Sequence, residues 1–244
     1  MTKLVFWHGW GMSPAVWTDL IGELKSRLPG DTRYDAMPLP GYAGTPLPEG
    51  EPVSVWVDAM MENVSGPVVL CGWSMGAIMA LSAAHRYPEK VAALVLFGAT
   101  PCFAERPDWD QCVSSLSEDA FRKGVQTGPD TTLRRFVTLF NRPDRNARAI
   151  VRQLASLEIP PAVVLEAGLD FLAAADFRAI VPEIRQKTLL VHGATDPLMP
   201  SGAAGWLAKA LPDARLHLLP GVAHAPFLSD PRQCSQLIGK FLNG

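Results

Sequence analysis

The sequence has few of the features that mark secreted, metal-binding or membrane-spanning proteins. Its four cysteines show no C-x-x-C spacing and no clustering with histidine, which argues against disulfides and a metal site and fits a reducing compartment. No apolar run reaches the roughly 20 residues that a membrane-spanning helix needs. The first residues also lack the pattern of a signal peptide. We therefore expect a cytoplasmic protein that uses no metal or other cofactor.

An excess of charge of either sign is also missing. The 244 residues carry a formal net charge of −2, so the chain as a whole gives no reason to expect binding to nucleic acid or to a membrane. Its hydrophobic content of 48 % is enough for one α/β core with an insertion, and we expect a monomer. Any charged partner must be recognised by a local surface.

The most informative stretch is Gly72-Trp73-Ser74-Met75-Gly76, which lies between the apolar run 68–71 and a small-residue helical run. Gly-x-Ser-x-Gly between a strand and a helix is typical of a nucleophile elbow, which exposes a serine hydroxyl on a strained turn. Gly72 and Gly76 suit that turn, because a Cβ at either would collide where strand and helix approach each other. We predict that Ser74 is a nucleophile, and such a serine argues against dehalogenases and epoxide hydrolases, which need a carboxylate here.

Apolar strands alternate with helices on both sides of a long helical stretch. This alternation predicts an α/β fold of the α/β-hydrolase type, with a mostly parallel sheet covered on both faces. Strands are expected at 4–7, 32–36, 68–72, 91–97, 188–193 and 215–219, and helices at 15–28, 54–64, 75–86, 202–211 and 231–242.

Between about Ala104 and Val181 the sequence shows no strand-like run. The helices expected there are 108–116, 118–126, 130–141, 145–157 and 161–173. This pattern predicts a helical cap at 104–181, inserted in a core made of residues 1–103 and 182–244.

Two further polar residues follow expected strands in the order that α/β-hydrolases use. Asp196 and His224 come after Ser74 in the chain, and the carboxyl ends of parallel strands meet at one edge of a sheet. We predict that His224 is the general base and Asp196 its acid partner, with His224 in a mobile loop. The alternatives for the acid are Asp170 and Asp176, which fall in the cap. The alternative histidines, in less suitable places, are His85, His192 and His217.

The first strand ends in His8-Gly9-Trp10-Gly11, a loop whose backbone can face a ligand. We predict an oxyanion hole formed by the backbone N–H groups of Trp10 and Met75. His8 is expected to hold this loop by hydrogen bonds, and the Trp10 ring is expected to form a pocket wall.

The cap contains a basic stretch of about twenty residues with a single acid, Asp144, inside it. Its arginines are Arg134, Arg135, Arg142, Arg145, Arg148 and Arg152. Two interpretations stay open, a solvated helix face and a docking surface for an acidic partner. At helical spacing Phe136 and Phe140 share one face, which either packs the cap on the core or roofs an apolar channel above Ser74.

Through these motifs the sequence resembles the BioH family, the pimeloyl-[acyl-carrier protein] methyl ester esterases of biotin synthesis, over nearly its whole length. The motifs are the Trp10 loop, the Ser74 elbow, Pro101-Cys102-Phe103, Arg135-Phe136 and Ala223-His224-Ala225-Pro226-Phe227. The resemblance implies a serine carboxylesterase that hydrolyses the methyl ester of a pimeloyl chain on acyl-carrier protein, with the cap arginines binding the acidic carrier. It implies substrate contacts at Trp10, Ser74, Met75, Phe136, Val137, Thr138, Leu139, Phe140 and His224.

The sequence departs from the family in three places. An edge strand before the first strand is not expected here, Ala77 replaces a usual glycine, and Phe140 stands where a polar residue is common. Two other functions remain open: a broad short-chain carboxylesterase or perhydrolase-like hydrolase without carrier specificity, and a catalytically silent binding protein on the same fold.

Overall fold

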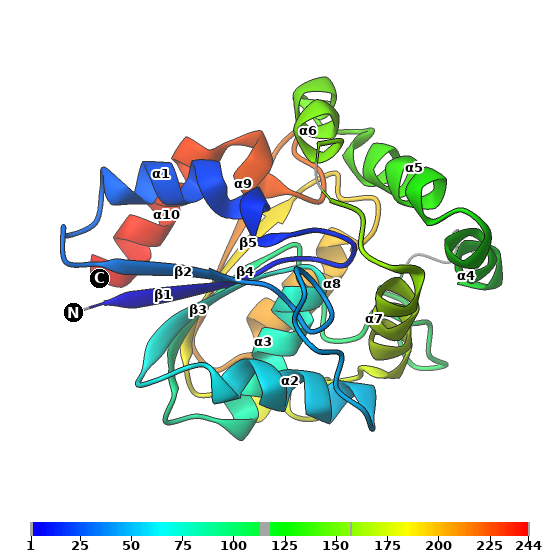
Figure 1. The fold of residues 1–244 in the computed structure, drawn as a ribbon. Coiled ribbons are helices and arrows are strands. Elements are labelled where there is room, and N and C mark those ends of the chain that lie inside the picture. The colour runs from blue at the N-terminus through cyan, green and yellow to red at the C-terminus, as the bar shows by residue number, and fades with distance from the viewer. Residues whose placement is uncertain (1, 113–117, 157, 244) are drawn as a thin grey trace.

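The computed structural model describes residues 2–112, 118–156 and 158–243 of the chain, which form a parallel sheet with helices on both faces (Figure 1). The strand order is β2-β1-β3-β4-β5-β6, and every neighbouring pair is parallel. The strands are β1 (Lys3–Trp7), β2 (Arg33–Met37), β3 (Val68–Trp73), β4 (Val91–Phe97), β5 (Lys187–Gly193) and β6 (Ala214–Leu219). All six residues of β3 are buried, as expected for a central strand covered on both faces.

Helices cover the two faces of the sheet, and Figure 1 shows both layers. On one face α1 (Thr18–Lys25) packs against α10 (Pro231–Asn243), and on the other lie α2 (Pro52–Glu62), α3 (Met75–Arg86) and α8 (Ser201–Ala210). The shorter elements are η1 (Pro14–Trp17), η2 (Val181–Glu183) and α9 (Pro226–Ser229). The helix expected at 15–28 is therefore divided: a 3₁₀ turn precedes α1, and α1 ends at Lys25.

The 98–186 segment between β4 and β5, called the insertion below, contains four α-helices, the 3₁₀ turn η2 and no strand of the sheet among its described residues. These helices are α4 (Glu118–Thr127), α5 (Pro129–Asn141), α6 (Ala147–Leu154) and α7 (Ala162–Ala174). They confirm four of the five helices expected there, within a few residues at each end. In Figure 1 they lie beyond the carboxyl ends of the strands, the edge at which Ser74, Asp196 and His224 were predicted to meet.

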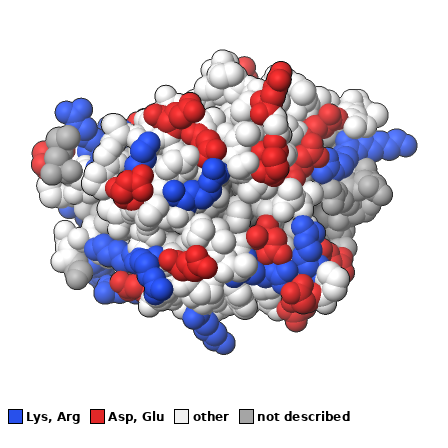
Figure 2. Space-filling model, turned by 90° about the horizontal axis from the view of Figure 1, so that it is seen from below, with Lys and Arg blue, Asp and Glu red and all other residues white. Residues whose placement is uncertain are grey.

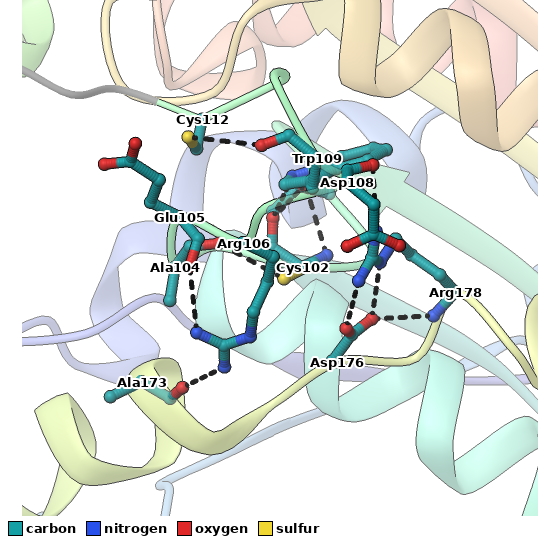
Figure 3. A network of polar contacts seen from close by, with 11 residues as sticks. Cys102, Ala104, Glu105, Arg106, Asp108, Trp109, Cys112, Ala173, Asp176 and Arg178 are labelled. Atoms are coloured by element: carbon teal, nitrogen blue, oxygen red, sulfur yellow. Dashed lines mark hydrogen bonds and ion pairs between the residues drawn. The ribbon is translucent and has the colours of Figure 1, made fainter.

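The helix expected at 108–116 is wrong for residues 108–112, and the rest of it lies outside the described residues. Packing of Trp109 outweighs the helical pattern here. Its backbone N–H donates to Arg106, its indole Nε1 donates to the carbonyl oxygen of Cys102 at 3.0 Å, and Arg178 stacks on its ring (Figure 3). A buried indole with its own acceptor is more favourable than a helical turn that would expose it.

The two ends of the insertion are joined to each other. Cys102 and Asp176 form an antiparallel bridge, and the backbone N–H of Phe177 donates to the carbonyl oxygen of Pro101 at 2.9 Å. The insertion therefore leaves the core and returns to it at one place, so its helices can pack over the sheet edge as one unit.

The surface shows no dominant charge on the face seen in Figure 2. Lysine and arginine side chains alternate there with aspartate and glutamate. In the described ranges, no helix combines the length and the apolar character that crossing a bilayer requires.

Candidate active site

Ser74 lies on the turn between β3 and α3 in a backbone conformation that non-glycine residues rarely adopt. Its φ is 56° and its ψ is −120°. Holding such a conformation costs about 1–3 kcal/mol, which the surrounding structure must supply. The backbone N–H of Ser74 donates to the carbonyl oxygen of Phe97 at 3.0 Å, which fixes the turn against β4. The side chain of this half-buried serine remains accessible.

The two glycines of the motif make this turn possible. A Cβ on Gly72 would overlap the backbone of Gly76, and a Cβ on Gly76 would overlap the carbonyl oxygens of Trp7 and His8. The predicted reason for both glycines, the close approach of strand and helix, is confirmed.

His224 and Asp196 form a buried hydrogen-bonded pair. The Nδ1 atom of His224 lies 2.7 Å from Oδ2 of Asp196, and both side chains are almost fully buried. The other carboxylate oxygen, Oδ1, accepts hydrogen bonds from the backbone N–H groups of Leu198 (2.9 Å) and Met199 (3.0 Å). Because Asp196 is ionised and accepts, Nδ1 of His224 carries the proton, and Nε2 is left with a lone pair. This Nε2 atom is buried and has no hydrogen-bond partner among the described residues.

The environment of Asp196 keeps it charged. Burial by itself raises the pKa of a carboxyl, but the charge and hydrogen bond of His224, together with His192 and the Met199 N–H, hold the pKa of Asp196 below its ordinary value. An ionised Asp196 can stabilise the imidazolium that forms when His224 accepts a proton.

The other aspartates considered for the acid have different partners. Asp170 pairs with Arg122 at 2.7 Å. Asp176 lies at the base of the insertion, where its carboxylate accepts from Arg178 at 2.6 Å (Figure 3). Of the three aspartates, Asp196 is therefore the one in contact with His224.

The other histidines considered for the base have different surroundings. His85 pairs with Glu183, and His217 is exposed on β6. His192 is buried, its Nε2 donates to the carbonyl oxygen of Met199 at 2.8 Å, and burial lowers the pKa of His192. It borders the pair, with Nε2 3.5 Å from Oδ2 of Asp196.

The loop after β1 borders Ser74. A Cβ on Gly9 would lie 3.2 Å from the Cβ of Ser74. The backbone N–H groups of Trp10 and Met75 donate to no acceptor among the described residues, and Met75 is the first residue of α3, where helical N–H groups are free. The unpaired N–H of Met75 is thus next to the serine in the chain, and that of Trp10 follows Gly9 in the loop that borders it.

His8 holds this loop, as predicted. Its Nδ1 donates to the carbonyl oxygen of Gly9 at 2.9 Å, and its Nε2 accepts from the backbone N–H of Leu39 at 3.1 Å. Burial lowers the pKa of His8 to about 4, so the ring is neutral and keeps both bonds at neutral pH.

The side chain of Trp10 joins the core to α7, which sequence reasoning did not find. Its Nε1 donates to the carbonyl oxygen of Leu165 at 2.8 Å, and a Cβ on Gly168 would clash with the indole. The sequence did carry a signal, since a glycine in the middle of an apolar helix often marks a close approach. On its other side the indole contacts Phe121 and Phe136, with ring centroids 5.3 and 5.2 Å away.

On the face of α5 that is directed at the core, aromatic rings pack near the ring of His224. The ring of Phe140 lies 5.6 Å from that of His224 and 5.1 Å from that of Phe136. Val137 is also buried and lines a cavity of about 150 Å³ between α5 and α6. Thr138 and Leu139 follow on the outer side of α5, where both are exposed, although Thr138 also lines this cavity. The structure thus places those two of the implied substrate contacts on the outer surface.

The outer face of α5 forms a basic groove. It is lined by Thr131, Arg134, Arg135, Thr138, Leu139 and Arg142. All six arginines of the basic stretch are exposed, and only two of them have an ion pair among the described residues: Arg134 with Asp130, and Arg145 with Asp230. Asp144, the single acid of the stretch, is buried and forms no ion pair with these arginines among the described residues.

Comparisons with known proteins agree with this architecture. The model of a family described as "Alpha/beta hydrolase family" matches residues 4–237. A protein of Aromatoleum aromaticum named pimeloyl-[acyl-carrier protein] methyl ester esterase is 42 % identical, covering 99 % of this chain and 98 % of its own. A protein of Nitrosomonas europaea with the same name is 34 % identical, covering 94 % and 91 %. A solved esterase from Exiguobacterium antarcticum shares the fold, with a TM-score of 0.86 at 20 % identity over 100 % of this chain and 92 % of its own.

Proposed function

Because the chain belongs to the alpha/beta hydrolase family, and within it to the pimeloyl-[acyl-carrier protein] methyl ester esterases, we propose that it hydrolyses the methyl ester of pimeloyl-acyl-carrier protein in biotin synthesis. The observation that carries the chemistry is the 2.7 Å contact between His224 and Asp196, which leaves Nε2 of His224 free at the sheet edge that also bears Ser74. The substrate comes from the names of the relatives, which align over nearly the whole chain.

In the acylation half of the reaction, Ser74 Oγ attacks the ester carbonyl carbon while Nε2 of His224 takes the hydroxyl proton. Asp196 stabilises the resulting imidazolium. The oxyanion of the tetrahedral intermediate accepts from the backbone N–H groups of Trp10 and Met75, where one lost donor typically costs about 3 kcal/mol of transition-state stabilisation. Collapse of the intermediate breaks the bond to the methoxy oxygen, which takes the proton back from His224 and leaves as methanol.

In the deacylation half, water replaces methanol. His224 Nε2 takes a proton from a water molecule that attacks the acyl carbon on Ser74, and the second tetrahedral intermediate uses the same backbone donors. When it collapses, the proton returns to Ser74 Oγ and the pimeloyl carboxylic acid is released on its carrier. The reaction consumes one water and needs no metal or redox group.

A methyl group offers little for a pocket to hold, so recognition must come from the acyl chain and its carrier. We place the methylene chain against the apolar rings of Trp10, Phe136 and Phe140, which join the insertion to the site. We place the acidic carrier on the basic groove of α5 and on α6. What supports this is that four of the arginines have no ion pair among the described residues: Arg135, Arg142, Arg148 and Arg152.

The proposal also includes a monomeric protein in the cytoplasm with no nucleic-acid partner. What supports a reducing compartment is that all four cysteines are free thiols, three of them buried.

The docking surface is tested by reversing two of its charges. In Arg135→Glu/Arg148→Glu we expect kcat/KM for pimeloyl-carrier methyl ester to fall about 10- to 100-fold, mainly through KM, because two attractive contacts become repulsive. Turnover of p-nitrophenyl acetate should stay within about twofold, since no docking is involved. Steady-state kinetics at two salt concentrations measures both substrates, and the difference between the proteins should shrink at high salt.

Arg33→Glu/Arg215→Glu is the matched control. It changes the net charge equally, and both exposed arginines lie near the amino ends of their strands, at the opposite edge of the sheet. Equal losses in the two double variants would mean that only overall charge matters. An unchanged kcat/KM for the carrier substrate in the α5–α6 variant would contradict the docking surface and favour a broad carboxylesterase.

A further inference from the structure

The loop that carries His224 is held from two sides. On the core side, Thr195 donates from its backbone N–H and its hydroxyl to the carbonyl oxygen of Val222, at 3.1 and 2.9 Å. The indole of Trp73 donates to the carbonyl oxygen of His224 at 2.9 Å. Residues 222–229 are all buried, so the prediction of a mobile loop is wrong. Donors of the core thus bond the carbonyl oxygen of Val222, two residues before the histidine, and the carbonyl oxygen of His224 itself.

The backbone N–H groups of the same loop bond to the insertion. The N–H of Ala223 donates to Oδ2 of Asp144 at 2.7 Å, and that of His224 points to the carbonyl oxygen of Phe140 at 3.5 Å. In the other direction, the N–H of Arg145 donates to the carbonyl oxygen of Gly221 at 2.9 Å. The turn between α5 and α6 is therefore hydrogen-bonded to the residues on the amino side of His224.

Asp144 is at the centre of this turn. Only 6 % of the residue is exposed, and its Oδ1 accepts from the backbone N–H of Asn146 at 2.7 Å and from the hydroxyl of Ser229 at 2.8 Å. With the N–H of Ala223, three donors satisfy the carboxylate, and no ion pair of the described residues includes it. A buried carboxylate is costly unless its oxygens are bonded, so its three short bonds fix it firmly in this place.

The same turn also holds the residues that follow the histidine. The amide of Asn146 donates to the carbonyl oxygen of Ser229 at 2.8 Å, and Arg145 pairs with Asp230 at 2.8 Å. Further along the loop, the ring of Phe227 stacks on Trp17 of the core at 4.1 Å. His224 therefore lies between two anchored stretches of chain, one contacted by Oδ2 of Asp144 and the other by its Oδ1.

We propose that Asp144 is a positioning residue for His224, acting from the insertion through the N–H of Ala223 and the hydroxyl of Ser229. It holds the imidazole so that Nδ1 stays on Asp196 while Nε2 faces the serine. This inference rests on the proposed role of His224 as general base, but not on the identity of the ester. Its basis is the bridging geometry of one buried carboxylate, which bonds the chain on both sides of the histidine.

The direct test is Asp144→Asn. An amide has one acceptor oxygen, so the N–H of either Ala223 or Asn146 must lose its partner. We expect kcat for p-nitrophenyl acetate to fall on the order of 10- to 100-fold, because a small misplacement of a catalytic group is enough for such a loss. KM should stay within about twofold, since no substrate contact changes. The low-field proton resonance of the His224–Asp196 hydrogen bond should weaken or broaden.

Asp176→Asn is the matched control. Asp176 is also a carboxylate of the insertion with several hydrogen bonds, which all come from Arg178 at the other end of the insertion (Figure 3). This variant should lose stability but keep kcat and the low-field resonance. Equal effects of the two variants on kcat and on the resonance would reduce Asp144 to a structural role and overturn the proposal.

A second variant covers the case in which Asp144→Asn does not fold. Ser229→Ala removes one donor from the same carboxylate and should lower kcat about threefold or more with KM unchanged. Unchanged kcat and an unchanged resonance in a folded variant of either kind would overturn the inference. If the wild type itself hydrolysed no ester, the proposed function would fail, and the resonance would still decide whether Asp144 positions His224.

Discussion

Replacing Ser74 with alanine is expected to lower kcat for ester hydrolysis by a factor of about 10⁴ to 10⁶. Without the hydroxyl no acyl-enzyme forms, and the backbone donors and the binding surface alone give only a small residual rate. Stopped-flow kinetics with p-nitrophenyl acetate measures the loss. Covalent labelling by a fluorophosphonate, followed by mass spectrometry, should occur at Ser74 in the wild type and disappear in the variant.

The matched control for this change is Ser82→Ala, which removes a buried hydroxyl from the same helix, α3. It should keep kcat within about twofold, since a single buried hydroxyl contributes little beyond stability. Ser74→Ala should fold, because alanine meets the same strain at a φ of 56° that serine does. If Ser74→Ala kept more than about a tenth of the activity, another group would have to be the nucleophile.

The second large effect is expected at Asp196. In Asp196→Asn the amide oxygen should take the place of Oδ1, because two backbone N–H groups, of Leu198 and Met199, donate there. The amide NH₂ must then face Nδ1 of His224, which can only accept, so the ring carries its proton on Nε2 instead. A protonated Nε2 cannot take the proton of Ser74. We expect kcat at neutral pH to fall about 10⁴-fold, the size seen when a catalytic histidine is held in the wrong tautomer.

The measurement that separates this cause from unfolding is proton NMR together with kinetics. The low-field resonance of the Nδ1 proton should be present in the wild type and absent in Asp196→Asn, while the melting temperature confirms that the variant folds. A folded Asp196→Asn protein with wild-type kcat would show that His224 works without this carboxylate.

The site was predictable where local pattern and topology determine it. Gly72 and Gly76 surround Ser74 at a spacing that only a tight strand–helix turn explains, and the structure has that turn. Asp196 and His224 lie about 120 and 150 positions after the serine. Their positions after strands of a parallel sheet were enough to predict that they lie at one edge, and the structure has the two in contact.

What could not be predicted depends on side chains that meet across long stretches of chain. In the sequence Asp144 is only the single acid among six arginines. No pattern in the neighbouring residues predicts that it accepts a hydrogen bond from Ala223, 79 positions later. The indole of Trp109 prevents an expected helix by a similar tertiary contact.

Incubating the wild-type protein with pimeloyl-acyl-carrier protein methyl ester, and then measuring the intact mass of the carrier, tests the proposed activity most directly. The predicted result is complete conversion of the methyl ester to the free acid, with one methanol released per carrier and no conversion by Ser74→Ala. A carrier that keeps its methyl ester while the same protein hydrolyses p-nitrophenyl acetate would contradict the proposed substrate.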